Sequence, residues 1–390
     1  MPHIVQPSNF DCCPDQSMKV LHVYRTYFPD PPGGLQEAIR QICLSVQPFG
    51  VENTIFTLSP APDPAELARP EARVVRQRSW AAPASCDLGS IAAFARFRRL
   101  ACEADVIHYL FPWPFADLLH CVVPRGKPAV LTYISDIVRQ QWMGKFYSPL
   151  MWRTLHDMRA IVANAPAYVQ TSPVLSSAVI RDRVRVIPPG IDERSCSQCG
   201  DDAVFNRLKL QEAEPYFLFV GVLRYYKGLP SLVQAAGGVG AKIVIAGSGP
   251  EEHALRNLVA CVGAGNVVFA GQVSDEEKVA LIRRCRGLVL PSHLRSEAFG
   301  MVLVEAAMHG KPMISCELGT GTSFVNVHAE TGLVVPPNSP QALSEAMNGL
   351  LADDELTAKM GRAARSRYER MFSGATLGLG YSRLFRDVAR

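Results

Sequence analysis

The sequence predicts an α/β protein built from two doubly wound parallel-sheet domains. The chain has 390 residues, which is enough for two domains that each bury a core of their own. Short apolar runs alternate with longer stretches of helical periodicity, a pattern typical of parallel strands connected by helices. A Pro- and Gly-rich segment at residues 184–192 separates two such series, so we expect one domain on each side of it.

The first series contains apolar runs that are short enough to be buried parallel strands. A loop at residues 25–34 follows the first run and ends in Gly33 and Gly34, and a helical pattern then covers residues 35–46. Glycine lets backbone approach a ligand closely, so this loop is a candidate phosphate-binding turn, although a weak one by itself. The expected strands are residues 19–24, 53–58, 106–109, 129–133 and 160–163.

The second series is similar in plan but shows no convincing sequence repeat of the first. Its expected strands are residues 216–220, 241–246, 267–270, 287–290, 312–315 and 332–335. We therefore expect domains at residues 18–190 and 191–374, with a last helical stretch at about 375–390. Residues 1–17 are polar and lack the apolar segment of a signal peptide. We expect them to be a disordered leader, with either Met1 or Met18 as the true start.

Composition excludes several classes of protein. The formal net charge is only +4, and no nucleic-acid-binding motif is recognisable, so we expect no nucleic-acid partner. No apolar run reaches the roughly 18 residues that span a membrane. The 11 cysteines are scattered, which favours reduced thiols and a cytoplasmic protein. Cys196 and Cys199 form a lone CxxC pair, for which ordinary thiols are a better explanation than zinc or redox chemistry.

Two carboxylates, Glu297 and Glu305, stand eight positions apart where a strand-like run passes through a loop into a helical run. This order puts Glu297 in the loop and Glu305 about one turn into the helix. Ligands of open parallel sheets bind beyond the carboxyl ends of the strands. The N–H groups of residues 298–302 favour an anion there. The alternative is that both acids are solvated charges near a helix start.

Two glycine-containing loops are further candidates for phosphate binding. In residues 221–228, Arg224 and Lys227 are close enough to converge on one anion; the alternative is two surface cations. A cation is unfavourable at a helix start unless an anion binds nearby. Gly247 lies in a second turn, residues 246–250, for which simple tight packing is the alternative explanation.

The segment from Ser292 to Ala306 resembles the E-x7-E motif of retaining GT-B glycosyltransferases of family 4. Residues 111–115, 224–228 and 319–326 are similar to a subgroup of bacterial O-polysaccharide mannosyl- and rhamnosyltransferases. The resemblance covers residues 19–390 and is strongest over 217–337. It implies two Rossmann-like domains facing across a cleft, with the final helix packed on the first domain.

The resemblance also implies an activity. The expected reaction transfers mannose or D-rhamnose, with retention, from a GDP-sugar to a lipid-linked oligosaccharide in lipopolysaccharide O-antigen biosynthesis. A UDP-sugar donor and a catalytically weak scaffold in a polysaccharide assembly complex remain as alternatives. The sequence contains no Asp-x-Asp, so the resemblance favours metal-independent catalysis with no cofactor besides the nucleotide-sugar.

Roles for individual residues follow from the same resemblance. Glu297 is expected to contact the sugar and stabilise its transition state, and Glu305 to bind the ribose hydroxyls. Arg224 and Lys227 would neutralise the diphosphate leaving group. Backbone at the remaining positions would contact the donor: Gly33, Gly34, Gly247, Ala298, Phe299, Gly300, Met301 and Val302.

The first domain departs from the family pattern. Ile134 and Leu110 stand where relatives carry histidine, and the histidine at position 134 would approach the donor sugar. His108 lies two residues before Leu110, on the same strand face, and is expected to substitute in part. Asp136 and Arg139 are further candidate contacts with the acceptor or sugar.

Two stretches of the first domain, residues 93–100 and 140–153, mix aromatic and basic side chains. Such a surface can rest on anionic lipid and present the site to a lipid-linked sugar. We therefore expect peripheral contact with the inner face of the cytoplasmic membrane. Other polysaccharide-assembly transferases are further expected partners. The alternative is an ordinary helix with a solvated basic face.

Overall fold

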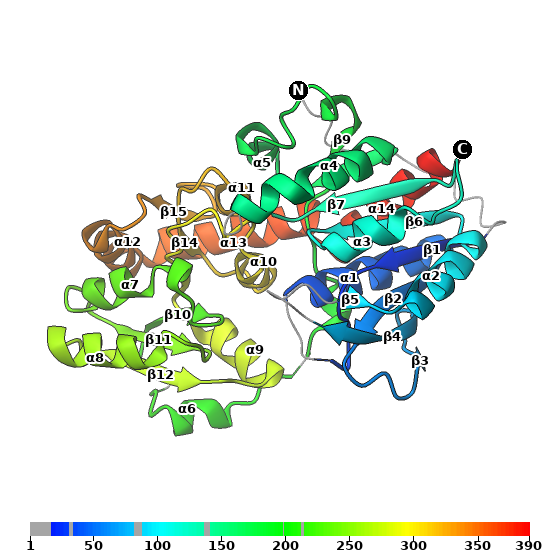
Figure 1. Ribbon diagram of the computed structural model, residues 1–390. Helices are drawn as coiled ribbons and strands as arrows, with labels where there is room; N and C mark the ends of the chain where they lie inside the picture. Colours follow the sequence, from blue (N-terminus) through cyan, green and yellow to red (C-terminus); the bar gives the residue numbers. More distant parts are fainter. Residues whose placement is uncertain (1–16, 31–33, 82–87, 136–140, 198, 212–213) are drawn as a thin grey trace. The chain divides into compact units, whose positions relative to one another are not determined.

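The computed structural model describes residues 17–30, 34–81, 88–135, 141–197, 199–211 and 214–390 (Figure 1). The chain divides into two compact units. The first comprises the residues up to Asp192 together with Gly374–Arg390, and the second comprises Glu193–Ser373. The expected boundaries at 190/191 and about 375 fall within two residues of these limits. Apart from Ser17, the expected leader lies outside the described residues.

The first unit is organised around one nine-stranded sheet. Its central strands are parallel, as the alternation of strands and helices predicts, while the short β3 and β5 pair antiparallel with β4. In spatial order the strands are β3 (Glu66–Ala68), β4 (Arg73–Ala81), β2 (Val51–Ser59), β1 (Met18–Val23), β6 (Val106–Phe111), β7 (Ala129–Tyr133), β8 (Ala160–Ala163) and β9 (Val184–Val186), with β5 (Leu88–Gly89) beside β4.

Strands β3 to β5 were not predicted, and β9 lies in the segment that was predicted to be a domain boundary. Strand β4 carries arginine at positions 73, 76 and 78, so its local pattern is too polar for a buried strand. The structure nevertheless buries Arg76, whose guanidinium donates to Ser59 Oγ at 2.8 Å and to the Ala61 carbonyl at 2.9 Å. Asp30 lies 3.4 Å from the same group. These partners come from other segments, so only the tertiary fold makes the strand stable.

The last helix, α14 (Gly374–Ala389), belongs to the first unit. Its apolar face, including Leu377, Tyr381 and Phe385, joins the core beneath the sheet. At Gly378 a Cβ would lie 2.0 Å from the Ser45 carbonyl oxygen, because α14 approaches α1 closely there. The other helices of this unit are α1 (Gly34–Val46), α2 (Ile91–Glu103), α3 (Pro114–His120), α4 (Gln141–Asp157) and α5 (Pro166–Thr171), with short 3-10 turns at Gln47–Phe49 and Arg181–Arg183.

The second unit has a six-stranded, wholly parallel sheet. Chain direction across the sheet reverses between β10 and β13, and such a switch point is where doubly wound sheets bind ligands. In spatial order the strands are β12 (Val267–Gly271), β11 (Lys242–Ala246), β10 (Tyr216–Val220), β13 (Gly287–Leu290), β14 (Met313–Cys316) and β15 (Gly332–Val335).

The helices of the second unit cover both faces of its sheet. Helix α9 (Asp275–Arg284) begins with the expected cap: Ser274 and Glu277 form a reciprocal capping box. Helix α10 (Met301–Met308) is almost entirely apolar, because it is buried between the sheet and α13 (Asp354–Met371). The others are α6 (Ala203–Arg207), α7 (Leu229–Ala236), α8 (Glu252–Val262), α11 (Thr322–Val325) and α12 (Pro340–Ala352), with 3-10 turns at Glu193–Ser195 and Tyr225–Lys227.

Candidate active site

The two loops that follow β10 and β13 bring Lys227 and Glu297 together at the switch point of the second unit. Lys227 Nζ donates to Glu297 Oε2 at 2.5 Å, and Ser292 Oγ donates to the same oxygen at 3.0 Å. All three residues are largely buried. A carboxylate and an ammonium group thus face each other at the edge where the sequence predicts anion binding. Their contact is too well enclosed for two solvated surface charges.

A glycine allows these loops to touch. Gly228 has φ +67°, and a Cβ there would lie 1.9 Å from the Pro291 carbonyl oxygen. The backbone N–H of His293 also donates to the Tyr226 carbonyl at 3.0 Å. Because the loops are joined on both sides of Lys227, its ammonium group is held next to Glu297.

Thr320 holds the backbone of Glu297. Its fully buried hydroxyl donates to the Glu297 carbonyl at 2.9 Å, and the N–H of Gly321 donates to the Ala298 carbonyl at 2.9 Å. A Cβ at Gly321 would lie 2.3 Å from the Phe299 ring. The sequence singled out residues 319–326 as a subgroup pattern but assigned them no role. In the structure, Thr320 and Gly321 of this stretch hold the loop that carries Glu297.

The start of α10 provides the other groups that can bind an anion. Gly300 has φ +82° and turns the chain into the helix, and Phe299 packs on Phe372 with 6.1 Å between ring centroids. Met301 and Val302 lie in the first turn, where N–H groups have no acceptor within the helix. The first turn of α10 and the Lys227 ammonium are therefore the donors that this edge offers to a phosphate.

Glu305 lies in the second turn of α10, as predicted. Its side chain is 22% exposed, and its Oε1 accepts from Lys278 Nζ at 3.2 Å. Lys278 comes from α9 and was not singled out by the sequence, because nothing local connects it with a residue 27 positions away.

Three other residues that were predicted to bind the donor are not part of the Lys227–Glu297 contact. The Arg224 side chain is exposed. The Gly247 N–H donates to the Gly271 carbonyl at 2.7 Å, and a Cβ at Gly247 would lie 2.0 Å from the Gly221 carbonyl oxygen. Gly247 therefore serves close packing, the alternative explanation, and its N–H is already used. Gly34 opens α1, and a Cβ there would meet nothing within 4 Å. Gly33, Asp136 and Arg139 lie outside the described residues.

The prediction that His108 contacts the acceptor or sugar is wrong. His108 lies in β6 at the centre of the first unit, with no exposed surface. Its Nδ1 is 2.9 Å from His22 Nδ1, and its Nε2 is 2.7 Å from Thr132 Oγ1. Both ring nitrogens are therefore engaged inside the core. The alternation of strand faces was correct, but the face that carries His108 points into the protein.

His108 belongs to a chain of hydrogen bonds, and Asn53 at one end fixes which group donates at each step. The Asn53 amide donates to two backbone carbonyls, so its Oδ1 accepts from His22 Nε2 at 3.0 Å. His22 Nδ1 then carries no proton and accepts from His108 Nδ1. His108 Nε2 in turn accepts from the Thr132 hydroxyl. The Thr132 oxygen accepts from the Tyr381 hydroxyl at 2.8 Å. Burial lowers the pKa of His22 to about 4 and also lowers that of His108, which keeps both rings neutral.

Ile134, which replaces the family's histidine, follows β7 and packs on an apolar cluster of the first unit. The cluster includes Tyr24, Tyr27, Ile39 and Leu110. Leu110, the second residue that departs from the family pattern, thus belongs to the same cluster. The two substitutions together make this region apolar.

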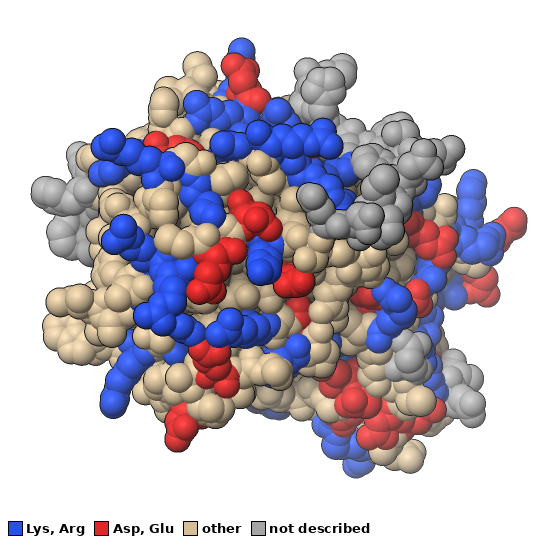
Figure 2. All heavy atoms as spheres, turned by 90° about the vertical axis from the view of Figure 1, so that its right-hand side faces the viewer, with Lys and Arg blue, Asp and Glu red and all other residues tan. Residues whose placement is uncertain are grey.

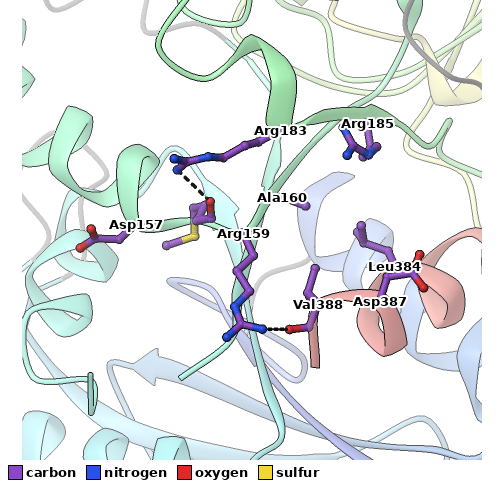
Figure 3. A pocket seen from close by; sticks show the side chains of 9 residues that line it. Asp157, Arg159, Ala160, Arg183, Arg185, Leu384, Asp387 and Val388 are labelled. Atoms are coloured by element: carbon purple, nitrogen blue, oxygen red, sulfur yellow. Dashed lines mark hydrogen bonds between the residues drawn. The ribbon is translucent and has the colours of Figure 1, made fainter. Parts of the chain in front are cut away.

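The first unit also has a cavity of about 570 Å³ beside the C-terminal end of α14 (Figure 3). Lys and Arg side chains are numerous on the side of the molecule where that helix ends (Figure 2). Arg159 donates to the Val388 carbonyl, Arg183 to that of Met158, and Arg185 to that of Val184. These arginines bind carbonyl groups at the ends of helices and strands. The cavity lies where β8 and β9 begin, at the sheet edge opposite to the one where ligands of such folds bind.

No cluster of three or more His, Cys, Asp or Glu side chains suited to a metal ion occurs within the described part of the chain. Cys196 and Cys199 are not joined in a disulfide.

Family models match both halves of the chain. Residues 32–195 match "Glycosyltransferase Family 4", and residues 201–367 match "Glycosyl transferases group 1". The chain is 46% identical to D-rhamnosyltransferase WbpZ of Pseudomonas aeruginosa, over 91% of this chain and 92% of that protein. It is 40% identical to O-antigen chain mannosyltransferase C of Escherichia coli, over 95% of this chain and 99% of that protein.

Solved structures agree in fold. Sucrose-phosphate synthase from Thermosynechococcus elongatus has a TM-score of 0.76 at 21% identity, over 95% of this chain and 99% of that one. HepE from Anabaena, in complex with UDP, also has a TM-score of 0.76, at 18% identity over 95% and 100% of the two chains. Fold, family models and similarity to the two curated transferases agree. The chain is a glycosyltransferase and belongs to the group 1, family 4 glycosyltransferases.

Proposed function

We propose that this enzyme transfers mannose or D-rhamnose from a GDP-sugar to a lipid-linked oligosaccharide during O-antigen assembly. The substrate class is supported by the names of the two relatives, one a D-rhamnosyltransferase and the other an O-antigen chain mannosyltransferase. The placement of the donor is supported by one observation above all. The Lys227–Glu297 pair, with Ser292, lies at the switch point of the second unit beside the open first turn of α10.

In this proposal the diphosphate binds at Lys227 and the first turn of α10. Negative charge grows on the leaving diphosphate as its bond to the sugar breaks, and a fixed cation stabilises that charge most in the transition state. Lys227 contacts Glu297 in the structure, so a phosphate bound there would share its ammonium group with the carboxylate. Glu297, held by Ser292 and Thr320, would then carry negative charge close to the oxocarbenium-like sugar.

The proposed transfer occurs on one face of the sugar. The bond between the anomeric carbon and the diphosphate oxygen breaks as the acceptor hydroxyl oxygen bonds to the same carbon. The hydroxyl proton passes to the departing phosphate oxygen, so the products are the glycoside and GDP, and the configuration is retained. Glu305 would accept hydrogen bonds from the ribose. Lys227 supplies the positive charge that a metal supplies in other transferases, and the sequence lacks the Asp-x-Asp that usually holds one.

We also propose that the enzyme meets its lipid-linked acceptor at the inner face of the cytoplasmic membrane. None of the helices in the described residues is both long and apolar enough to cross a bilayer. The predicted stretch 93–100 buries Phe97, so its aromatic face belongs to the core. Nearby, however, Trp80 is 82% exposed and Ile91 is 88% exposed, while Arg98 and Arg99 face solvent. Exposed apolar groups beside cations favour contact with anionic lipid.

A donor screen tests the proposal. The purified full chain is mixed with GDP-mannose, GDP-rhamnose, GDP-fucose or a UDP-sugar, with and without a lipid-linked oligosaccharide and with and without EDTA. Nucleotide release is followed, and the anomeric configuration of the product is determined by NMR. We expect acceptor-stimulated GDP release from the mannose or rhamnose donor, retention of configuration and no effect of EDTA.

Two matched variants make the screen specific. Glu297→Gln should remove acceptor-stimulated release. Glu214→Gln should retain it, because Glu214 pairs with Lys242 at 2.8 Å where β11 begins, far along the strand from the carboxyl edge. Release of UDP, inversion of configuration or inhibition by EDTA would each contradict the corresponding part of the proposal. Equal activity of Glu297→Gln and the parent would refute the proposed site.

A further inference from the structure

Glu305 is held by a residue of a different helix. Lys278 Nζ lies 3.2 Å from Glu305 Oε1, and both side chains are about three-quarters buried, with 26% and 22% exposed. Helix α9 connects β12 to β13 and α10 connects β13 to β14, in the same direction across the sheet. Right-handed crossovers therefore place both helices on one face of the sheet. The ion pair links these two helices near the switch point.

Lys278 is itself fixed in place. Its Nζ lies 3.2 Å from Asp275 Oδ1, one turn earlier in α9. The capping box formed by Ser274 and Glu277 holds the start of this helix, and Arg207 donates to Glu277 at 2.6 Å. An ammonium group anchored in this way presents a defined position to Glu305, whereas a lysine on a frayed helix end would not.

Two nearby carboxylates favour the charged form of Lys278. Burial by itself lowers the pKa of Lys278, but the Glu305 and Asp275 carboxylates outweigh it and raise that pKa above its usual value. Lys278 is therefore cationic throughout the range in which enzymes work. A cation at 3.2 Å stabilises the carboxylate of Glu305 and restricts its rotation.

From this geometry we propose that Lys278 is a positioning residue, which holds the Glu305 carboxylate oriented to accept hydrogen bonds from the two ribose hydroxyls of the donor. The inference rests on the proposed function, since it takes Glu305 as the ribose contact. It adds that helix α9, through Lys278, contributes to the enzyme's discrimination between ribonucleotides and nucleotides that lack these hydroxyls.

The test compares GDP with 2′,3′-dideoxy-GDP by isothermal titration calorimetry on the full chain. Two hydroxyl groups donating to a charged, fixed carboxylate should make the parent bind GDP about 10- to 100-fold more tightly than the dideoxy nucleotide. Lys278→Met keeps the aliphatic stem and removes the charge. We expect it to reduce this ratio to about threefold or less, and to raise the donor KM while changing kcat little.

Two control variants separate positioning from a general structural role. Lys278→Arg retains a cation and should preserve most of the ratio. Lys242→Met removes the cation of a different ion pair in the second unit, with Glu214, and should also preserve it. A merely structural link between the helices would instead lower the thermal stability of Lys278→Met and leave the ratio unchanged, and that result would overturn the inference alone. Equal binding of the two nucleotides by the parent would overturn the ribose assignment together with it.

Discussion

Two polar arrangements of this glycosyltransferase, one in each unit, differ in their charge and in their exposure. In the first unit, His22, His108 and Tyr381 are buried in the core and form a neutral hydrogen-bonded chain. In the second unit, the ion pairs Lys227–Glu297 and Lys278–Glu305 lie at the carboxyl edge of the sheet and keep some exposure. Buried polar groups are stable when they are neutral and fully paired, whereas a group that must exchange partners with a ligand needs access. The first arrangement serves the fold, and the second serves the chemistry.

The largest expected effect is the loss of activity on removing the Lys227 charge. Lys227→Met should lower kcat about 10²- to 10³-fold, because one preorganised charge on the leaving group is lost. The folded state should survive, since the variant keeps the side chain's apolar stem. Initial rates at saturating donor, with circular dichroism as a check on folding, measure this.

Lys242→Met is the matched control. Lys242 also pairs with a glutamate in the second unit, Glu214, but at the start of β11. Removal of the Lys242 charge should leave kcat within about twofold of the parent value, as expected for a surface ion pair. Equal losses in the two variants would mean that the second unit's ion pairs act through stability, and the contrast drawn here between the units would fail.

The second expected effect is a selective loss of stability of the first unit in acid. The folded pKa of His22, about 4, is below the value of 6.5 for an unfolded chain, so the unfolded state binds the proton first. The stability from neutral His22 is therefore complete above pH 6.5 and is lost progressively as the pH falls from 6.5 to about 4. This amounts to about 3 kcal/mol for one group.

Other groups modify the size of this effect. Burial also lowers the pKa of His108 and His120 in the first unit and that of His309, to about 4, in the second. Asp117 acts in the opposite direction: burial raises its pKa to about 6, so its protonation below that pH favours the folded state. Among the described residues, three histidines with lowered pKa belong to the first unit and one to the second, so the first should lose more.

Tryptophan emission distinguishes the two units. All four tryptophans of the chain, at positions 80, 113, 142 and 152, belong to the first unit. Urea unfolding is followed by tryptophan emission and by far-UV circular dichroism at pH 7.5 and pH 5.0. We expect the emission midpoint to move to lower urea more than the circular dichroism midpoint. Equal movement of the two midpoints would contradict the assignment to the first unit.

A pair of glycine substitutions should have a smaller and opposite effect on the two units. Gly378→Ala places a methyl group against the Ser45 backbone in the first unit and should cost about 1–3 kcal/mol of stability. Gly349→Ala in α12 of the second unit meets nothing within 4 Å and should stabilise by about 0.5–1 kcal/mol. Tryptophan emission should report the first change and not the second. A stabilised Gly378→Ala would refute the close contact of α14 with α1.

The smallest expected effect concerns Ile134. The resemblance to family 4 enzymes puts a histidine near the donor sugar at this position, and mannose has a C6 hydroxyl group where rhamnose has a methyl group. Ile134→His should therefore raise the ratio of kcat/KM for GDP-mannose over GDP-rhamnose, by up to about tenfold. Ile134→Leu is the apolar control and should leave the ratio unchanged. An unchanged ratio in both variants would show that the first unit does not select the sugar through this residue.

Local pattern was sufficient for most of the fold. The central parallel strands, the helix at Met301–Met308 and the cap at Ser274 follow from hydrophobic periodicity and turn residues, which act over a few positions. Local pattern failed at β4, where a buried arginine finds its partners in other segments.

In the candidate site, too, some features follow from local sequence and others only from tertiary packing. The sequence by itself determined that Lys227, Glu297 and Glu305 stand at the ends of strands or the start of a helix. The order of strand, loop and helix follows from patterns that extend over only a few residues. Only the tertiary structure decided which groups meet: Lys227 and Glu297 are 70 positions apart, and Thr132 and Tyr381 are 249 apart. It also decided that His108 is a core residue and that Ser292, Thr320 and Lys278 hold the two carboxylates. Contacts between distant segments depend on how the elements pack, and a periodicity that spans a few residues does not determine that packing.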